Sequence, residues 1–379
     1  MKSNDYIQTR HLHNMKENWS VVIGFRRDYK QKSMQTIAQL LDKRTDLSDK
    51  VSEEYLEKEF ERILIAAYRT DETDKRNFIA NQAETFLANI RPSDKLVYTR
   101  ILNVYAKKQH VIGDLTILPD FAALSNHCKS KGITSDLITF MEPKNQTSGN
   151  SVFIEVKVRA SDDQQIKKEY LHKANEVLNL FRIFVGDVPK LEGETGIRNG
   201  HFSIYDETTK SMQSSLESNI GDFVSSPLLL DNFFLNDPFI KLTSLFGDIK
   251  RTQMQQKIFK AIYWLGESQK EHDKHVKLVQ LITSLESLLI EGCEKKCDTI
   301  KERLPKLLID DETKRKEIEK TIKDAYGLRD DILHDGRRRF IKEKLLYDLR
   351  ACSLGAIFKV ADKNLSDFSA LKNELQNKK

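Results

Sequence analysis

The stretch from Ala325 to Gly336 reads AYGLRDDILHDG, and it decides how the C-terminal third of this chain is interpreted. Within it, four residues separate Arg329 from His334. A guanidinium binds a phosphate through a planar fork of donors, and an imidazole exchanges protons near neutral pH. The pair therefore suits cleavage of a phosphodiester, and the sequence around it indicates which fold presents it.

Around this stretch, apolar side chains recur at helical spacing from Leu245 to the end of the chain. The polar residues Asn373–Lys379 are expected to fray. A run of helices with apolar faces predicts a helical bundle. The predicted helices are Arg251–Leu265, Asp273–Glu291, Thr299–Leu308, Glu312–Tyr326, Arg329–His334 and Lys342–Ala361.

Residues 1–240 mix both kinds of element. Predicted helices cover Glu53–Arg69, Asp74–Ile90 and Asp163–Phe184, and predicted strands cover Ser20–Phe25, Val97–Tyr105, Val111–Leu118 and Ser151–Val158. The pattern loses its periodicity over Ser211–Gly247, where we place the interdomain segment. The expected fold class is therefore α+β, with a mixed α/β N-terminal domain over residues 1–240 and an all-α bundle over residues 245–379.

Composition sets limits on function. A chain of 379 residues is longer than most single domains, which favours two. The formal net charge is +5, and the excess of basic side chains lies from Leu245 onward, which gives modest support for a polyanionic partner. The N-terminus is polar and no apolar run reaches the ~20 residues that span a bilayer, so we expect no membrane association and a cytoplasmic location.

The cysteines do not indicate a disulfide framework or a metal site. Four cysteines in so long a chain are too few for such a framework. Cys293 and Cys297 are spaced to share a helical face, but no second pair or nearby histidine completes a tetrahedral zinc site. We expect no metal and no cofactor.

Over about residues 250–365 the sequence resembles HEPN domains, most closely those of the Apea-like subgroup. Arg329 and His334 match the R-x4-H signature of the family. The order and spacing of several other segments fit as well. These are the helices Lys257–Gly266 and Leu278–Leu289, the latter with its Leu-Glu-x-Leu element at Leu285–Leu288, followed by Ile300, Arg303, Leu304 and Arg315.

The resemblance implies a metal-independent endoribonuclease that works as a homodimer, with two R-x4-H motifs meeting across a two-fold axis. Val152–Val158, which leads into the helix Asp163–Phe184, is similar to regions that precede Apea-like HEPN domains. That architecture implies a prokaryotic defence or toxin role. RNA would be the substrate, and the N-terminal domain would sense a phage-derived or nucleic-acid trigger.

The chemistry assigns a role to each residue of the motif. His334 would act as general acid/base on the ribose 2′-hydroxyl or the leaving 5′-oxygen, while Arg329 would bind the scissile phosphate. Asp330 fits the polar position after the arginine and would orient one of the pair. Glu286 would pair with Arg329, supported by Tyr326 from the same motif. The basic residues that follow the motif, Arg337, Arg338 and Arg339, would contact backbone phosphates.

On a regular helix, Arg329 and His334 would point ~140° apart. They would converge if Arg329 began a helix after Gly327, or if a second copy completed the site. The pair Asp335-Gly336 predicts a helix end, which leaves His334 near a helix C-terminus.

Each assignment has a structural alternative. Arg329 beside two aspartates suits an ion pair, and His334 suits a helix cap. The run Arg337–Arg339 suits a solvated helix entry, and Glu286 suits a buried structural acid. A HEPN bundle that only dimerises or binds RNA therefore stays open.

A metal-dependent nuclease is the other alternative. Asp114 followed by Glu155-Val156-Lys157 resembles the D…E-x-K pattern of restriction-endonuclease-like folds, in which such residues hold a divalent metal. The simpler interpretation is that Glu155, Lys157 and Arg159 form the solvent face of a strand whose other face is apolar.

Overall fold

A computed structural model describes residues 7–12, 20–25, 51–69, 74–133, 151–186, 189–191, 200–217, 228–247, 250–335 and 339–378. The chain has the α+β class expected from its sequence, with a sheet in the N-terminal part and helices after it. The Gly- and Asn-bearing stretches 142–150 and 193–200, whose composition predicts loops, lie outside the described residues apart from Gly200.

The chain divides into two compact units. One comprises Met1–Leu96, Lys157–Leu171 and Tyr205–Ser211, and the other comprises Val97–Val156, His172–Ile204 and Met212–Lys379. The second unit therefore contains strands of the sheet as well as the helical C-terminal region. The domain boundary placed near residue 240 stays a prediction.

The predicted strand Ser20–Phe25 and the two predicted helices are present, and one further strand, β1, was not predicted. Strand β1 (Ile7–Leu12) pairs antiparallel with β2 (Ser20–Phe25). Helices α2 (Glu53–Arg69) and α3 (Lys75–Asn89) follow, and Asp74 caps α3 by accepting a hydrogen bond from the backbone N–H of Asn77. A small core forms beside them from Val51, Leu56, Ile90, Tyr55, Phe60, Phe86 and Leu87.

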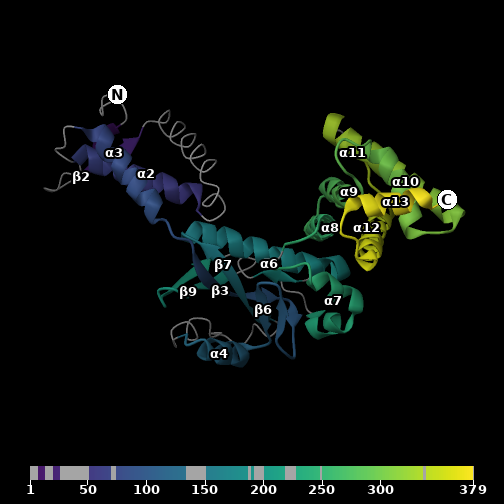
Figure 1. Ribbon diagram of the computed structural model, residues 1–379, viewed down its shortest axis with the longest axis horizontal. Coiled ribbons are helices and arrows are strands. Elements are labelled where there is room, and N and C mark those ends of the chain that lie inside the picture. The colour runs from purple at the N-terminus through teal and green to yellow at the C-terminus, as the bar shows by residue number, and fades with distance from the viewer. Residues whose placement is uncertain are drawn as a thin grey trace. The chain divides into compact units, whose positions relative to one another are not determined.

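The main sheet has the strand order β10-β9-β3-β7-β6-β5, with β8 paired to β3. Figure 1 shows helix α6 (Asp163–Val185) lying along the sheet and α4 (Phe121–Ser130) on its other side. The strands are β3 (Ser93–Leu102), β5 (His110–Ile112), β6 (Leu115–Leu118), β7 (Ser151–Ala160), β8 (Lys190–Leu191), β9 (Gly200–Asp206) and β10 (Met212–Glu217).

Two predicted strands are each divided into two. Val97–Tyr105 breaks at Asn103, which separates β3 from the short strand β4 (Val104–Tyr105). Val111–Leu118 was expected to be continuous, but β5 and β6 form an antiparallel hairpin that turns at Gly113 and Asp114. Gly113 has φ +56°, a conformation that suits glycine, and its Cα lies against the backbone of Gly247. The glycine that looked like part of a strand therefore makes the turn.

The segment Ser211–Gly247 was expected to be irregular, but it contains β10, the short strand β11 (Leu228–Leu229) paired parallel to β4 (Val104–Tyr105), a 3-10 turn at Leu230–Leu235 and helix α7 (Asp237–Thr243). Phenylalanine rings, rather than apolar residues at regular spacing, pack this segment against the rest of the protein. Phe233 and Phe239 pack their rings on Phe181 and Phe184 of α6.

The C-terminal region is a bundle of the helices α8 to α13, drawn green to yellow in Figure 1. Their bounds are α8 (Gln253–Lys270), α9 (Lys274–Leu289), α10 (Lys296–Leu308), α11 (Glu312–Asp335), α12 (Glu343–Lys363) and α13 (Phe368–Asn377). Two predicted helices, Glu312–Tyr326 and Arg329–His334, are one continuous helix, α11. Gly327 does not interrupt the helix. Its backbone is helical, its position is exposed, and no other atom lies close to where a side chain would be.

The bundle contacts α6 within the second unit. A Cβ atom on Gly266 of α8 would lie 2.3 Å from the Cβ of Asn179, so only glycine fits there. The Asn179 side chain donates a hydrogen bond to Glu267 (2.8 Å). Arg350 of α12 donates to the carbonyl oxygen of Ile183 (3.3 Å) near the C-terminal end of α6. Cations at a helix C-terminus are favourable, so Arg350 stabilises the end of α6.

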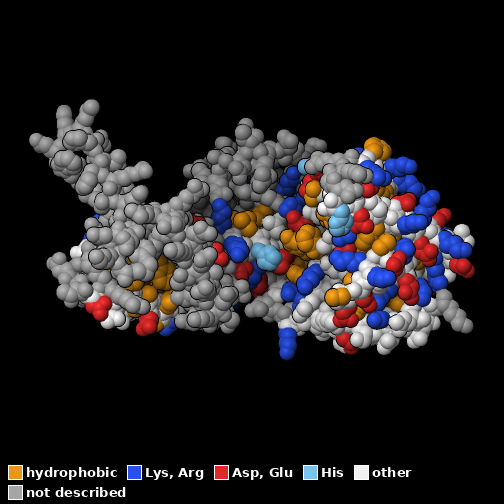
Figure 2. All heavy atoms as spheres, turned by 90° about the horizontal axis from the view of Figure 1, so that it is seen from above, with side chains coloured by type: hydrophobic (Ala, Val, Ile, Leu, Met, Phe, Trp, Pro, Cys, Tyr) orange, Lys and Arg blue, Asp and Glu red, His pale blue; other side chains and the backbone are white. Residues whose placement is uncertain are grey.

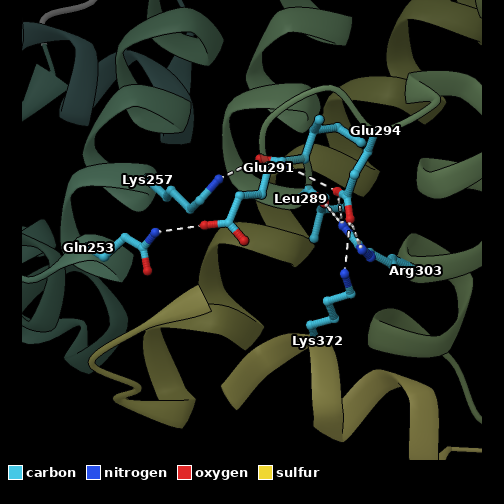
Figure 3. A network of polar contacts seen from close by, with 8 residues as sticks. Gln253, Lys257, Leu289, Glu291, Glu294, Arg303 and Lys372 are labelled. Atoms are coloured by element: carbon cyan, nitrogen blue, oxygen red, sulfur yellow. Dashed lines mark hydrogen bonds and ion pairs between the residues drawn. The ribbon is translucent and has the colours of Figure 1, made fainter. Parts of the chain in front are cut away.

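Helix α13 was not expected, since its polar end suggested fraying. Phe368 is fully buried, with the ammonium of Lys257 at 4.2 Å from its ring centroid. Figure 3 shows the polar network beside it, in which Arg303 donates to both carboxylate oxygens of Glu294 (2.7 and 2.6 Å). Lys372 of α13 reaches the same carboxylate at 3.3 Å. Apolar burial and a shared ion pair thus fix the helix.

Among the described residues, no helix has both the length and the apolar composition needed to cross a membrane.

Candidate functional site

Arg329 lies on α11 and faces a carboxylate on α9. Its Nη2 atom is 3.8 Å from Oε1 of Glu286, and its Nη1 donates to Oδ1 of Asp330 at 3.1 Å. The Arg329 side chain is 22% exposed, so part of its fork of donors faces solvent. The guanidinium has five N–H donors, and its contacts with Glu286 and Asp330 occupy only some of them. The remaining donors can bind another anion.

Glu286 is the point where three helices meet. Its Oε1 accepts a hydrogen bond from the Tyr326 hydroxyl on α11 (2.9 Å), and its Oε2 lies 2.7 Å from Nζ of Lys296 at the start of α10. The Glu286 side chain is 12% exposed. The carboxylate is therefore well paired, and the predicted proximity of Glu286, Tyr326 and Arg329 is what the structure shows.

Tyr326 is a buried hydroxyl donor. Burial raises its pKa well above the ordinary tyrosine value, and the neighbouring Glu286 carboxylate raises that pKa further. The phenol therefore keeps its proton at any physiological pH and can donate to Glu286. The guanidinium of Arg329 lies 5.7 Å from the centroid of the same ring.

His334 is exposed in the last turn of α11, and the helix ends at the next residue, as predicted. Because Arg329 sits inside the same regular helix, the two side chains leave the helix axis ~140° apart. The idea that Arg329 begins a new helix after Gly327 is wrong. One chain therefore presents the arginine and the histidine in different directions.

The other predicted residues lie at or beyond the edge of this cluster. The Asp330 side chain is 55% exposed and contacts Arg329 through the hydrogen bond described above. Arg339 pairs with Asp331 (3.0 Å), and its carbonyl oxygen lies 2.9 Å from Nε2 of His275. Arg337 and Arg338 lie outside the described residues.

Charge on the face drawn in Figure 2 is mixed. Lysine and arginine side chains are interspersed with aspartate and glutamate over the helical region, so no broad field of one sign covers that face. Local cations near Glu286, rather than a wide basic surface, are the feature that favours an anion here.

The residues of the D…E-x-K pattern are not gathered. Asp114 lies in the β5–β6 turn and pairs with Lys173 of α6 (2.7 Å). Glu155 on β7 instead bonds to side chains of α4, which lies on the other side of the sheet from α6. Within the parts of the chain that the structure describes, no three His, Cys, Asp or Glu side chains come together to hold a metal.

Glu155 is buried, not on a solvent face as the alternation suggested. It accepts hydrogen bonds from the Tyr98 hydroxyl (2.5 Å) and Lys131 (2.8 Å), with Nε2 of His127 at 2.9 Å. Burial acts to raise its pKa, but the hydrogen bonds from Lys131 and Tyr98 outweigh burial and leave the pKa lowered. This cluster was not predicted, because α4 and β7 are separate along the chain and no local pattern indicates that they pack together.

The cysteines are free thiols. Burial raises the pKa of Cys128 and that of Cys352 to about 11, so both stay protonated at neutral pH.

Comparison with family models, with curated proteins and with solved structures finds no match to this chain. The HEPN resemblance therefore rests on the residues described above.

Proposed function

We propose that this chain is a metal-independent endoribonuclease of the HEPN type. The observation that carries the proposal is the placement of Arg329. It is partly exposed on α11, supported by Glu286 from α9, and followed on the same helix by an exposed His334. A guanidinium supported by a neighbouring carboxylate and an exposed imidazole, brought together from two copies of the chain, are the groups that phosphodiester cleavage by an internal hydroxyl requires.

In the proposed reaction, the ribose 2′-oxygen attacks the adjacent phosphorus and the bond from phosphorus to the 5′-oxygen breaks. A His334 imidazole removes the proton from the 2′-hydroxyl, and a protonated imidazole gives one to the leaving 5′-oxygen. Arg329 binds the non-bridging oxygens as charge develops on them. The products are a 2′,3′-cyclic phosphate and a 5′-hydroxyl, and DNA is not cut because it lacks the attacking group.

The proposal includes a homodimer, because one chain aims Arg329 and His334 in different directions. An apolar rim of four exposed side chains near the end of α11 supports such a partner surface. Lys274–Glu343 (2.6 Å) and Arg339–Asp331 (3.0 Å) bring the helix ends that carry the rim together. The rim consists of Val276 (42% exposed), Leu333 (51%), Phe340 (83%) and Tyr347 (68%).

The biological setting follows from the resemblance alone. We propose that the enzyme acts in the cytoplasm in defence or as a toxin, and that the N-terminal region responds to a phage-derived or nucleic-acid trigger. The assignment of a sensing role rests on analogy of architecture.

The deciding experiment is RNA cleavage by the purified protein in excess chelator, with product ends analysed. Wild type is expected to cut and leave cyclic phosphate ends, and Arg329→Ala and His334→Ala are each expected to lower the rate by ~100-fold or more. His272→Ala, which replaces another exposed histidine of the same region, is the matched control and should cut like wild type.

Other outcomes point elsewhere. Cutting that stops with chelator and survives both replacements would move the active site to Asp114 and Glu155. RNA binding without cutting, unchanged in His334→Ala, would indicate a non-catalytic HEPN module.

The dimer has its own test. Light scattering should give twice the mass of one chain for wild type and a single mass for Phe340→Asp with Tyr347→Asp, and that double variant should lose cleavage. A wild-type monomer that cuts RNA would contradict the shared site.

A further inference from the structure

We propose that Lys296 is a positioning residue that keeps Arg329 available to bind a phosphate. It would do so by holding the Glu286 carboxylate, which otherwise competes for the guanidinium. The inference rests on the proposed function in that the phosphate is taken to be that of RNA.

The geometry around Glu286 is unequal. Lys296 Nζ is 2.7 Å from Oε2, within ion-pair and hydrogen-bond range, and the Tyr326 hydroxyl is 2.9 Å from Oε1. Arg329 Nη2 is 3.8 Å from Oε1, which is beyond hydrogen-bond range. The lysine and the tyrosine therefore take the close contacts of the carboxylate, and the arginine is only loosely attracted.

Exposure supports the same division of roles. Lys296 is 47% exposed and reaches inward from the first residue of α10 to a carboxylate that is 12% exposed. Its single charge neutralises that carboxylate locally. The Arg329 guanidinium is then not required as the counter-ion, and its remaining donors can grip a phosphate in the bidentate manner that arginine favours.

Removal of Lys296 should reverse this arrangement. A mostly buried carboxylate without its ion-pair partner is costly, and Arg329 is the next cation in reach. We expect the guanidinium to close the gap to Glu286 and form a full salt bridge. An arginine so engaged would bind phosphate less well and would react more slowly with reagents that attack free guanidinium groups.

Two simpler roles for Lys296 make different predictions. If Lys296 bound the phosphate itself, its loss would weaken RNA binding but would leave Arg329 as reactive as before. If it only stabilised the fold, its loss would lower stability in urea, and Glu286→Gln would restore that stability, but Arg329 modification would not slow in the folded protein. Only capture of Arg329 by Glu286 predicts slower Arg329 modification that Glu286→Gln reverses, because the neutral amide no longer attracts the guanidinium.

The experiment uses the full chain with Lys296→Met, Glu286→Gln, both together, and Lys296→Arg. Lys295→Met, at the exposed neighbour, is the matched control. The first readout is the rate at which phenylglyoxal modifies Arg329, followed by peptide mass spectrometry. The second is RNA cleavage in chelator, resolved into kcat and KM, with unfolding in urea measured for every variant.

We expect Lys296→Met to slow Arg329 modification several-fold and to raise KM for RNA by about tenfold with a smaller change in kcat. The double variant should recover the Arg329 modification rate to near the wild-type value and should bring KM down from that of Lys296→Met. Lys296→Arg, which keeps the charge, should stay close to wild type in both readouts, and Lys295→Met should change neither. Unchanged Arg329 reactivity in Lys296→Met, or a defect that Glu286→Gln does not reverse, overturns the proposal.

The two readouts separate this inference from the proposed function. Phenylglyoxal modification needs no RNA, so a wild type that never cuts RNA refutes the nuclease and still reports on Lys296. If Arg329 reactivity then falls and recovers as described, the positioning role stands for whatever anion Arg329 binds.

Discussion

Two carboxylates in this molecule, Glu155 in the sheet region and Glu286 in the helical bundle, have similar partners but differ in how closely those partners approach. Each accepts a hydrogen bond from a buried tyrosine hydroxyl and an ion pair from a lysine. Glu155 also has His127 at 2.9 Å, whereas Glu286 has Arg329 at 3.8 Å.

The difference lies in whether all of the neighbouring donors are within hydrogen-bond range of the carboxylate. At Glu155 the close donors come from β3 and α4, and they hold α4 against the sheet. At Glu286 one cation stays outside hydrogen-bond range and partly exposed. We call a carboxylate saturated when all of its neighbouring donors lie within hydrogen-bond range, and a saturated carboxylate acts as a structural tie. Glu286 is unsaturated in this sense, because Arg329 lies 3.8 Å away and keeps donors for a ligand.

The largest effect expected from this comparison is that of Glu155→Ala on stability. The change leaves Tyr98, His127 and Lys131 without their acceptor in a buried place, which should lower the free energy of unfolding by about 3 kcal/mol or more. Urea unfolding at pH 7 measures it. Lys157→Ala, two residues along the same strand and exposed, should cost far less, and equal losses would mean that the Glu155 cluster is no structural tie.

Glu286→Ala is expected to cost less, about 1–2 kcal/mol, because Lys296 and Arg329 regain solvent when the carboxylate is gone. The same urea experiment checks it. A loss as large as that of Glu155→Ala would show that both carboxylates are structural ties and would remove the contrast between the regions.

Removing a single tyrosine hydroxyl beside each carboxylate refines the comparison. Tyr98→Phe should cost about 1–1.5 kcal/mol and Tyr326→Phe about 0.5–1 kcal/mol. Both rings are buried, but Tyr98 (0% exposed) lies deeper than Tyr326 (4%), and its carboxylate partner is also the more buried one. Thermal unfolding of the two variants beside wild type gives the ranking. Burial raises the pKa of both phenols, so neither should titrate by ultraviolet absorbance until the protein unfolds in alkali.

The smallest expected effect tests whether saturation, rather than region, sets the behaviour. Glu294 belongs to the helical bundle but is saturated, since the Arg303 hydrogen bonds lower its pKa to about 2. Its folded pKa is below the ordinary value of ~4.3, so its stabilisation is complete above that pH and fades as the pH falls toward about 2.

Glu294→Gln should therefore be less stable than wild type at pH 7, and the difference should shrink steadily below pH ~4. Urea unfolding at a series of pH values measures the trend. A difference that does not vary with pH would mean that the Glu294 charge contributes nothing beyond its shape.

Much of the fold follows from local pattern. Helices α2, α6 and α9 begin and end within two residues of their predicted bounds, because apolar spacing and caps such as Asp273 are local signals. The hairpin at Gly113 and the unbroken α11 were missed for one reason. A glycine in sequence does not reveal whether its backbone turns, as at Gly113, or stays helical, as at Gly327.

The candidate site was predictable only in part. The roles of Arg329, Tyr326 and Glu286 were predicted, because the motif and the apolar spacing of α9 are both visible in the sequence. Lys296 was not, because its approach to Glu286 depends on how α10 leaves the turn after α9. The burial of Glu155 depends on α4 in the same way, and no alternation along β7 encodes that cover.

The close approach of α8 to α6 has a consequence for how this sequence can drift. Gly266 has no room for a Cβ beside Asn179, while Gly327 of α11 has nothing near that position. Among related chains, substitutions at 327 should accumulate freely. A larger residue at 266 should appear only alongside a smaller one at 179, so these two positions should change as a pair.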